Sequence, residues 1–366
     1  MNNKQNTIHL TGLNGLRAIA ALSVVIGHTF QDTFGDWGIT GLHLPIFRGG
    51  VTLFFVISGF LITYLLLQEK KKINDIKIGA FYMRRILRIW PIYYLYIIVC
   101  IIVLALLGLS DTILTDKLWY YIFFAANIPF LSSTGIAMLV HFWSIGVEEQ
   151  FYLFWPWLAK FSKRYLLPII CTVGILWFGL KIGSWIAFTN QSLIYKFFNV
   201  TKFHCMMLGA LGAVLYDKNH KMYLTIFSNK IGQIAVWTIF LLSGFWGDYV
   251  PAIIREEIIA VMSLFLITGQ VCNTCFINLE NKACDYVGKI SYGIYVIHPL
   301  LIFISSYAYR QLDLDLPILL QQIGIYIYVL VATIFVANLS YNYVEKPFLK
   351  LKHKFAIVRS QTSIKK

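Results

Sequence analysis

The sequence predicts an all-α, polytopic integral membrane protein with about ten transmembrane helices. Of its 366 residues, 58% are hydrophobic and only 13% are charged, and the mean hydropathy is +0.68. A water-soluble domain would aggregate with so apolar a composition. A bilayer core of about 30 Å needs about 20 mostly apolar residues per helical span, and ten stretches of the chain approach that length. The solvent for most of this chain is therefore lipid.

Each expected span is an apolar run between more polar connections. The ten spans cover residues 16–31, 46–67, 89–109, 142–158, 166–186, 203–215, 231–246, 258–271, 287–307 and 316–339. The sixth and eighth are shorter than a bilayer requires. A further apolar segment, 118–130, has about 13 residues, which suits an interfacial or re-entrant helix, and we expect it to break at Asn127 and Pro129.

Lysine and arginine residues predict the orientation of the spans. Of the 31 such residues, 24 fall in alternate connections and only seven on the opposite side. Because cationic loops are retained in the cytoplasm, this bias predicts a multi-pass protein of the cell (inner) membrane with both termini cytoplasmic. The net charge of +14 is explained by these flanking cations, so we expect no nucleic-acid partner.

Arg17 and His28 are ionisable residues in the first expected span. Their separation of eleven residues corresponds to about 1100° of helical rotation and a rise of about 16 Å, so they share one helix face. One elongated ligand could therefore contact both. The structural alternative is an Arg that extends to the interface and a His that is satisfied by a neighbouring side chain.

Arg84, Arg85 and Arg88 cluster where the third span begins. Arg85 and Arg88 are i, i+3 neighbours, and guanidinium groups bind phosphate in a bidentate manner. Such a cluster at a cytoplasmic helix start suits an anionic cosubstrate from the cytosol. The alternative is a positive-inside anchor that only orients the helix.

Glu148 and Glu149 are adjacent carboxylates midway through an aromatic span. Adjacent helical residues diverge by about 100°, so the two cannot face the same partner. The two glutamates could act in catalysis or form structural ion pairs, and the sequence favours neither role. Cys272, Cys275 and Cys284 lack a fourth ligand at a suitable spacing, so we expect no metal site.

Five motifs occur in one order along nearly the whole chain. They are Arg17-x10-His28, the run 50–62 with Ser58-Gly59-Phe60, Arg85-x2-Arg88, the run 142–152 with Glu148 and Glu149, and the run 291–299 that ends in His298-Pro299. Together they resemble the family-3 membrane acyltransferases. The last motif departs from the family pattern, which has a second aromatic residue where Ile297 stands, and we assign no role to His298.

The resemblance implies a single membrane-embedded acyltransferase domain over residues 1–366 that moves acyl groups, most often acetyl, from cytosolic acyl-CoA to sugars. It implies His28 as the catalytic residue, with Glu149 and Glu148 as further candidates. Arg17, Arg85, Arg88 and Ser58 are the implied contacts to the acyl-CoA cosubstrate. Some relatives append an extracytoplasmic esterase-like domain, and we expect none here, so that the acceptor is acylated directly.

The expected acceptor is a hydroxyl of a surface polysaccharide or a lipid-linked glycan, reached through a cavity that crosses the protein. His28 could deprotonate this hydroxyl, which we favour, or carry the acyl group itself. Two rival functions stay open. One is a secondary transporter of an anionic solute, which also buries charges near the bilayer midplane, and the other is an acyltransferase that acts on membrane lipid.

Overall fold

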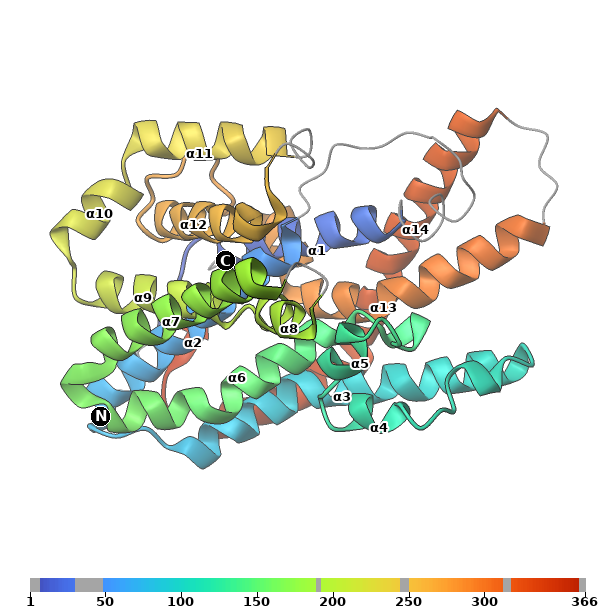
Figure 1. Cartoon of the computed structure of the whole chain (residues 1–366), viewed down its shortest axis with the longest axis horizontal. Coiled ribbons are helices and arrows are strands. Elements are labelled where there is room, and N and C mark those ends of the chain that lie inside the picture. The colour runs from blue at the N-terminus through green and yellow to red at the C-terminus, as the bar shows by residue number, and fades with distance from the viewer. Residues whose placement is uncertain (1–6, 30–48, 189–191, 244–249, 312–316, 362–366) are drawn as a thin grey trace.

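The computed structural model describes residues 7–29, 49–188, 192–243, 250–311 and 317–361. Helices dominate this part of the chain, which confirms the all-α prediction (Figure 1). The expected span limits at residues 31, 46, 246 and 316 lie outside the described residues. Lys4 and Arg48 of the charge count lie outside them as well.

The longer helices are α1 (Leu13–Thr29), α2 (Gly50–Ile73), α3 (Ile78–Leu106), α6 (Phe142–Phe161), α7 (Leu166–Phe188), α8 (Leu193–Thr201), α9 (Phe203–Asp217), α11 (Lys230–Leu242), α12 (Ala252–Val271), α13 (Lys282–Gln311) and α14 (Ile318–Ser340). The short ones are α4 (Leu118–Ile122), α5 (Asn127–Leu131), α10 (Lys221–Phe227), α15 (Lys346–Lys352), η3 (Ser110–Thr112), η4 (Ala137–Leu139), η5 (Lys163–Tyr165), the π-helix η7 (Tyr341–Glu345) and η8 (His353–Phe355). Strands β1 (Thr7–His9) and β2 (Arg359–Gln361) form one parallel pair.

Each of the ten expected spans contains a helix. Within the described ranges, six helical segments are long and apolar enough to cross a membrane, or seven if the bent pair α10 and α11 forms one span. The first expected span has only 17 helical residues in α1, and α6 and α12 each carry two adjacent glutamates. The chain is therefore a multi-pass membrane protein, while the count of ten and the cytoplasmic termini stay predictions.

The apolar segment 118–130 breaks earlier than we expected. Helix α4 ends at Ile122 and α5 begins at Asn127, so the break lies at residues 123–126, and Asn127 and Pro129 are inside the second helix. Phe124 takes a left-handed φ of 56°, which ends α4. Pro129 is tolerated because the first N–H groups of a helix have no intrahelical acceptor.

Close contacts through glycine bring four central helices together. A Cβ atom on Gly59 of α2 would lie 2.0 Å from the Met206 carbonyl oxygen of α9, and one on Gly288 of α13 would lie 2.1 Å from the Asn14 carbonyl oxygen of α1. Small residues at such positions let membrane helices approach at backbone distance. The tight α1–α13 contact positions the first expected span against the ninth.

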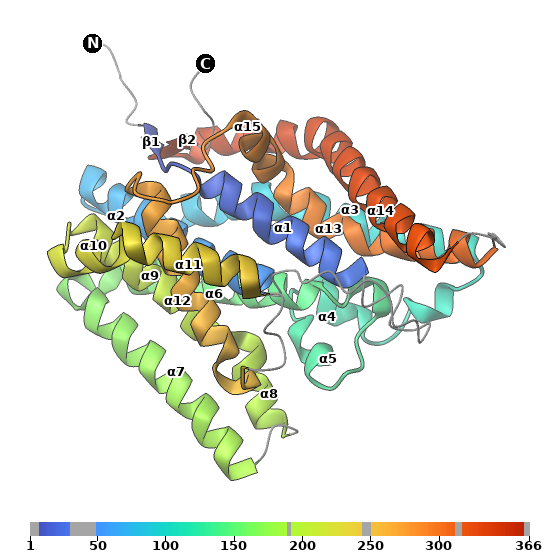
Figure 2. The ribbon, with the colours of Figure 1, turned by 90° about the horizontal axis from the view of Figure 1, so that it is seen from above.

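The strand pair joins the two ends of the described chain. Thr7 of β1 is in register with Arg359 of β2, and Figure 2 shows this pair beside α15 on one side of the molecule. In the same view α7 and α14 lie on opposite sides of the bundle with α1 between them. Helix α1 packs against α2, α12, α13 and α14, and its Asn14, Ser23 and Thr29 side chains are buried.

Candidate functional site

A cavity lies among α1, α2, α3, α6 and α13. It is lined by Arg17, Val51, Phe54, Phe55, Ile57, Ser58, Arg85, Arg88, Ile89, Ser144, Ile145, Glu148, Tyr152, Ser291, Tyr292 and Tyr295. All five sequence motifs contribute to this lining, although they are spread from residue 17 to residue 295. We call this space the first cavity.

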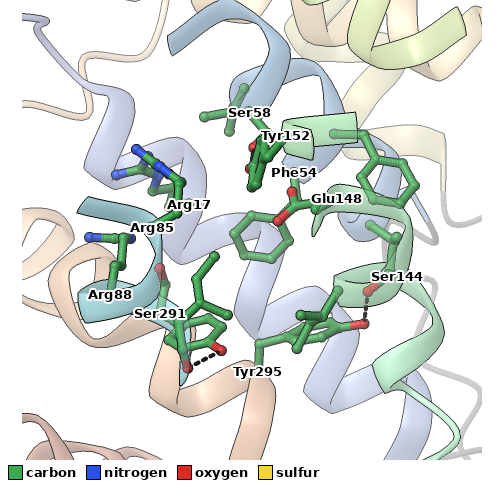
Figure 3. Close-up of a pocket in the computed structure, with 16 residues that line it drawn as sticks. Arg17, Phe54, Ser58, Arg85, Arg88, Ser144, Glu148, Tyr152, Ser291 and Tyr295 are labelled. Carbon is green, nitrogen blue, oxygen red and sulfur yellow. Dashed lines mark hydrogen bonds between the residues drawn. The ribbon is translucent and has the colours of Figure 1, made fainter. Parts of the chain in front are cut away.

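Three arginines lie on one side of the first cavity, and Glu148, Ser144 and Tyr295 lie toward the other (Figure 3). Among the described residues, Arg17, Arg85 and Arg88 form no ion pair, and the buried Nε of Arg85 has no hydrogen-bond partner. The Arg85 guanidinium lies 5.4 Å from the centre of the Tyr152 ring. Guanidinium groups left without a carboxylate in a protein interior suit an anionic ligand.

Arg84 differs from its neighbours in the same cluster. Its Nη2 lies 2.9 Å from Oε2 of Glu69, and its Nη1 donates to the Phe355 carbonyl oxygen at 2.8 Å. The Glu69 side chain is only 2% exposed. Arg84 therefore has a structural role, whereas Arg85 and Arg88 turn toward the first cavity.

Two lysines elsewhere in the spans are paired with glutamates. Lys181 of α7 lies 2.7 Å from Glu257 of α12, and Lys202 lies 2.8 Å from Glu256. Lys202 also breaks α8 from α9 with a left-handed φ of 42°. These pairs satisfy the general expectation for intramembrane charges. The unpaired arginines of the first cavity depart from it.

The two carboxylates of α6 point in different directions, as their 100° separation predicts. Glu148 lines the first cavity and Glu149 does not. Oε1 of Glu149 is buried without a hydrogen-bond partner. The Ser58 and Tyr152 hydroxyl groups share a hydrogen bond at the cavity wall beside Glu148. Only Glu148 is placed to contact a ligand in this cavity.

His28 lies near the C-terminal end of α1 and contacts a second histidine. Its Nδ1 is 2.9 Å from Nε2 of His298, and the two ring centres are 5.1 Å apart. Unlike Arg17, His28 is not part of the first-cavity lining. It is connected to the cavity wall through His298, whose Nδ1 lies 2.7 Å from the Tyr295 carbonyl oxygen.

The hydrogen bonds of the pair define its protonation pattern. A carbonyl oxygen only accepts, so Nδ1 of His298 carries a hydrogen and donates to Tyr295. His298 is completely buried, which favours the neutral ring, and its Nε2 is then an acceptor. The hydrogen between the rings therefore belongs to Nδ1 of His28. This leaves Nε2 of His28 with a free lone pair.

A network of polar groups supports the histidine pair. The Tyr295 hydroxyl donates to the His141 carbonyl oxygen at 2.9 Å, and Ser144 Oγ lies 2.6 Å from that hydroxyl. Nε2 of His141 donates to the Val296 carbonyl oxygen at 3.1 Å. These bonds fix α13 against the start of α6.

His298, His141, Tyr295 and Tyr152 are site residues for which the sequence predicted no role. The available signal was a histidine three residues after Tyr295 within an apolar span. The unusual Ile297 next to it does not disturb the pair, because adjacent helical residues diverge by about 100°. Within the described ranges, no group of three or more His, Cys, Asp or Glu side chains could hold a metal ion.

Comparison with known proteins agrees with the motifs. The acyltransferase domain family matches residues 10–341. A protein of Staphylococcus aureus (strain COL), provisionally named an O-acetyltransferase, is 31% identical over 93% of this chain and 58% of its own length. The O-acetyltransferase OatA of Staphylococcus aureus (strain MRSA252) is 29% identical over 97% of this chain and 60% of its own length.

The chain spans about three fifths of the length of the curated relatives it matches. No solved structure matches the chain. The family match covers all five motifs and confirms the resemblance that they carry. The chain belongs to the membrane acyltransferase family defined by this acyltransferase domain.

Proposed function

We propose that this protein is a membrane O-acyltransferase that moves an acetyl group from cytosolic acetyl-CoA to a hydroxyl of a cell-surface or lipid-linked carbohydrate. The observation that carries the proposal is the first cavity, where three arginines share one space with Glu148 and Tyr295 and form no ion pair with any residue that the structure describes. The names of the relatives support O-acetyl transfer as the reaction.

The arginines suit the phosphate groups of the donor. Arg17, Arg85 and Arg88 come from the ends of α1 and α3 that the charge bias predicts to be cytoplasmic. From Arg17 to His28 the α1 axis rises about 16 Å, which matches an extended pantetheine arm in length. The thioester would then reach the histidine pair from the cytoplasmic side.

His28 has the protonation state that general-base catalysis requires. Its Nε2 accepts the proton of the acceptor hydroxyl while the hydroxyl oxygen attacks the thioester carbonyl carbon. The new C–O bond forms, the C–S bond breaks, and the CoA thiolate takes the proton from His28. His298 holds His28 in this tautomer and stabilises the imidazolium that forms transiently, because its Nε2 faces Nδ1–H of His28.

The test is acetyl transfer from isotopically labelled acetyl-CoA, measured with the whole protein in membranes. We expect label in the carbohydrate fraction, detected by mass spectrometry, and none with His28→Ala protein of equal abundance. Label in carbohydrate that does not depend on the protein would overturn the proposal. Label in lipid would indicate a lipid-directed acyltransferase, and solute uptake without acyl transfer would indicate a transporter.

A further inference from the structure

A second cavity lies beside the first, between α2, α3 and the C-terminal segment. It is lined by Ile62, Leu65, Leu66, Glu69, Phe81, Arg84, Arg85, Lys352, His353, Ala356 and Val358. Arg85 belongs to the lining of both cavities. A ligand that passes Arg85 could therefore occupy both spaces at once.

The charges of the second cavity are unbalanced toward positive. Glu69 is neutralised, because its two oxygens accept from Arg84 at 2.9 Å and from the Lys77 backbone N–H at 2.9 Å. Lys352 is partly buried and forms no ion pair or hydrogen bond with any described residue. Lys352 lines this cavity together with Arg84 and Arg85, and the Glu69 carboxylate beside them is already paired with Arg84.

Arg85 and Lys352 form no ion pair with a described residue, so their mutual repulsion opposes folding and an anionic ligand would relieve it. Arg17, Arg85 and Arg88 line the first cavity, and Lys352 extends the positive region into the second. One phosphate would not need so wide a region. A ligand with several phosphates, spread over both cavities, would satisfy it.

The rest of the second cavity is apolar. Leu65, Leu66 and Phe81 face the same space as the basic side chains. Phe81 is buried and packs edge-to-face against Tyr152 with ring centres 6.4 Å apart, so it offers a rigid surface. A flat heteroaromatic base could pack on such a wall while its attached phosphates reach Lys352 and Arg85.

We propose that the second cavity binds the nucleotide half of the acyl-CoA donor, a 3′-phosphorylated adenosine diphosphate, with Lys352 and Arg85 on its phosphates. The pantetheine arm then runs past Arg85 into the first cavity. This inference rests on the proposed function and adds a binding site built by the C-terminal segment to it. Lys352 is a donor-binding residue in this scheme, distant from the reacting atoms.

The test compares two acetyl donors that differ only in the nucleotide half, acetyl-CoA and acetyl-pantetheine. We expect Lys352→Gln to raise the KM for acetyl-CoA about tenfold, because a charged hydrogen bond to phosphate is lost. The preference for acetyl-CoA over acetyl-pantetheine should fall by the same factor. Lys352→Arg should retain most of the wild-type preference. The matched control is Lys350→Gln, which replaces an exposed lysine of the same helix.

Equal donor preference in wild type, Lys352→Gln and Lys350→Gln proteins would overturn the inference while leaving the proposed function intact. If the wild type transfers no acetyl group, the proposed function fails. A direct binding measurement then tests whether the second cavity is a nucleotide site. Adenosine 3′,5′-bisphosphate should bind the purified wild type and lose about tenfold in affinity with Lys352→Gln. Equal affinity for the two proteins would overturn the site.

Discussion

Nδ1 of His28 and Nε2 of His298 are 2.9 Å apart, although the two residues are separated by 270 positions in the chain. Because His298 donates from its other nitrogen to the Tyr295 carbonyl oxygen, His28 is held with Nε2 unprotonated. The pair resembles a base with an orienting partner, in which the second group selects the tautomer of the first.

Replacing His28 with Ala should lower the rate of acetyl transfer by a factor of about 10² to 10⁴, because the general base is lost. The protein should still fold, since His28 lies near the end of α1 and is only half-buried. Transfer is measured with labelled acetyl-CoA, and folding by size-exclusion chromatography in detergent. Retained activity in the folded variant would contradict the assignment.

His298 should act on kcat and hardly on the KM for the donor. With His298→Leu, Nδ1 of His28 loses its acceptor and the tautomer is no longer selected, so we expect kcat to fall about 10²-fold. His298→Gln offers a carbonyl oxygen to His28 and should recover part of that loss. An equal fall in kcat for His298→Leu and His298→Gln proteins of equal stability would show that His298 has no positioning role.

Arg88 and Arg84 should give opposite phenotypes. Arg88→Gln removes a cation that has no ion-pair partner among the described residues, so we expect weaker acetyl-CoA binding and unchanged thermal stability. Arg84→Gln leaves the buried Glu69 carboxylate without its partner and should cost about 3–5 kcal/mol of stability.

The measurements are isothermal binding of acetyl-CoA and thermal unfolding in detergent, with both variants compared side by side. Binding by Arg88→Gln should also lose part of its dependence on salt, because one phosphate contact is gone. A stable Arg84→Gln protein would show that Glu69 is satisfied without Arg84.

Glu148 should contribute more to activity than Glu149. Glu148 lines the first cavity, whereas Glu149 is turned away from it. We therefore expect Glu148→Gln to lower kcat/KM at least tenfold and Glu149→Gln to lower it less. Steady-state kinetics of both variants decides the point, and a larger loss with Glu149→Gln would reverse the assignment.

Gly288 should be intolerant of a side chain. An added Cβ would meet the Asn14 carbonyl oxygen at 2.1 Å, so Gly288→Ala should push α13 away from α1 and cost about 1–3 kcal/mol. The same shift would separate His28 from His298 and reduce acetyl transfer. The matched control is Gly324→Ala in α14, where nothing lies within 4 Å of the added atom. Equal stability of the two variants would contradict the close α1–α13 packing.

Much of the fold could be predicted from the sequence because hydrophobic runs and cationic connections are local signals. Each apolar run contains a helix. The break within residues 118–130 was misplaced because a left-handed Phe124 ends α4, and no local rule favours that conformation for phenylalanine.

The site was only partly predictable. The shared face of Arg17 and His28 follows from helix geometry, but the lining of the first cavity includes Arg17 alone. Within the cluster 84–88, the sequence could not tell that Arg84 pairs with Glu69 while Arg85 and Arg88 form no ion pair in the described part of the chain. Burial and pairing depend on neighbouring helices, and they are invisible along one helix.

The sequence by itself determined that this is a helical membrane protein of the acyltransferase family, since hydropathy and motif order are properties of the chain. Only the tertiary structure decided which charges lack an ion pair among the described residues, that Lys352 lines a cavity with Arg84 and Arg85, and that His298 contacts His28. The physical reason is that these relations arise between helices far apart in the sequence. Close packing at residues such as Gly288, rather than any local pattern, brings them together.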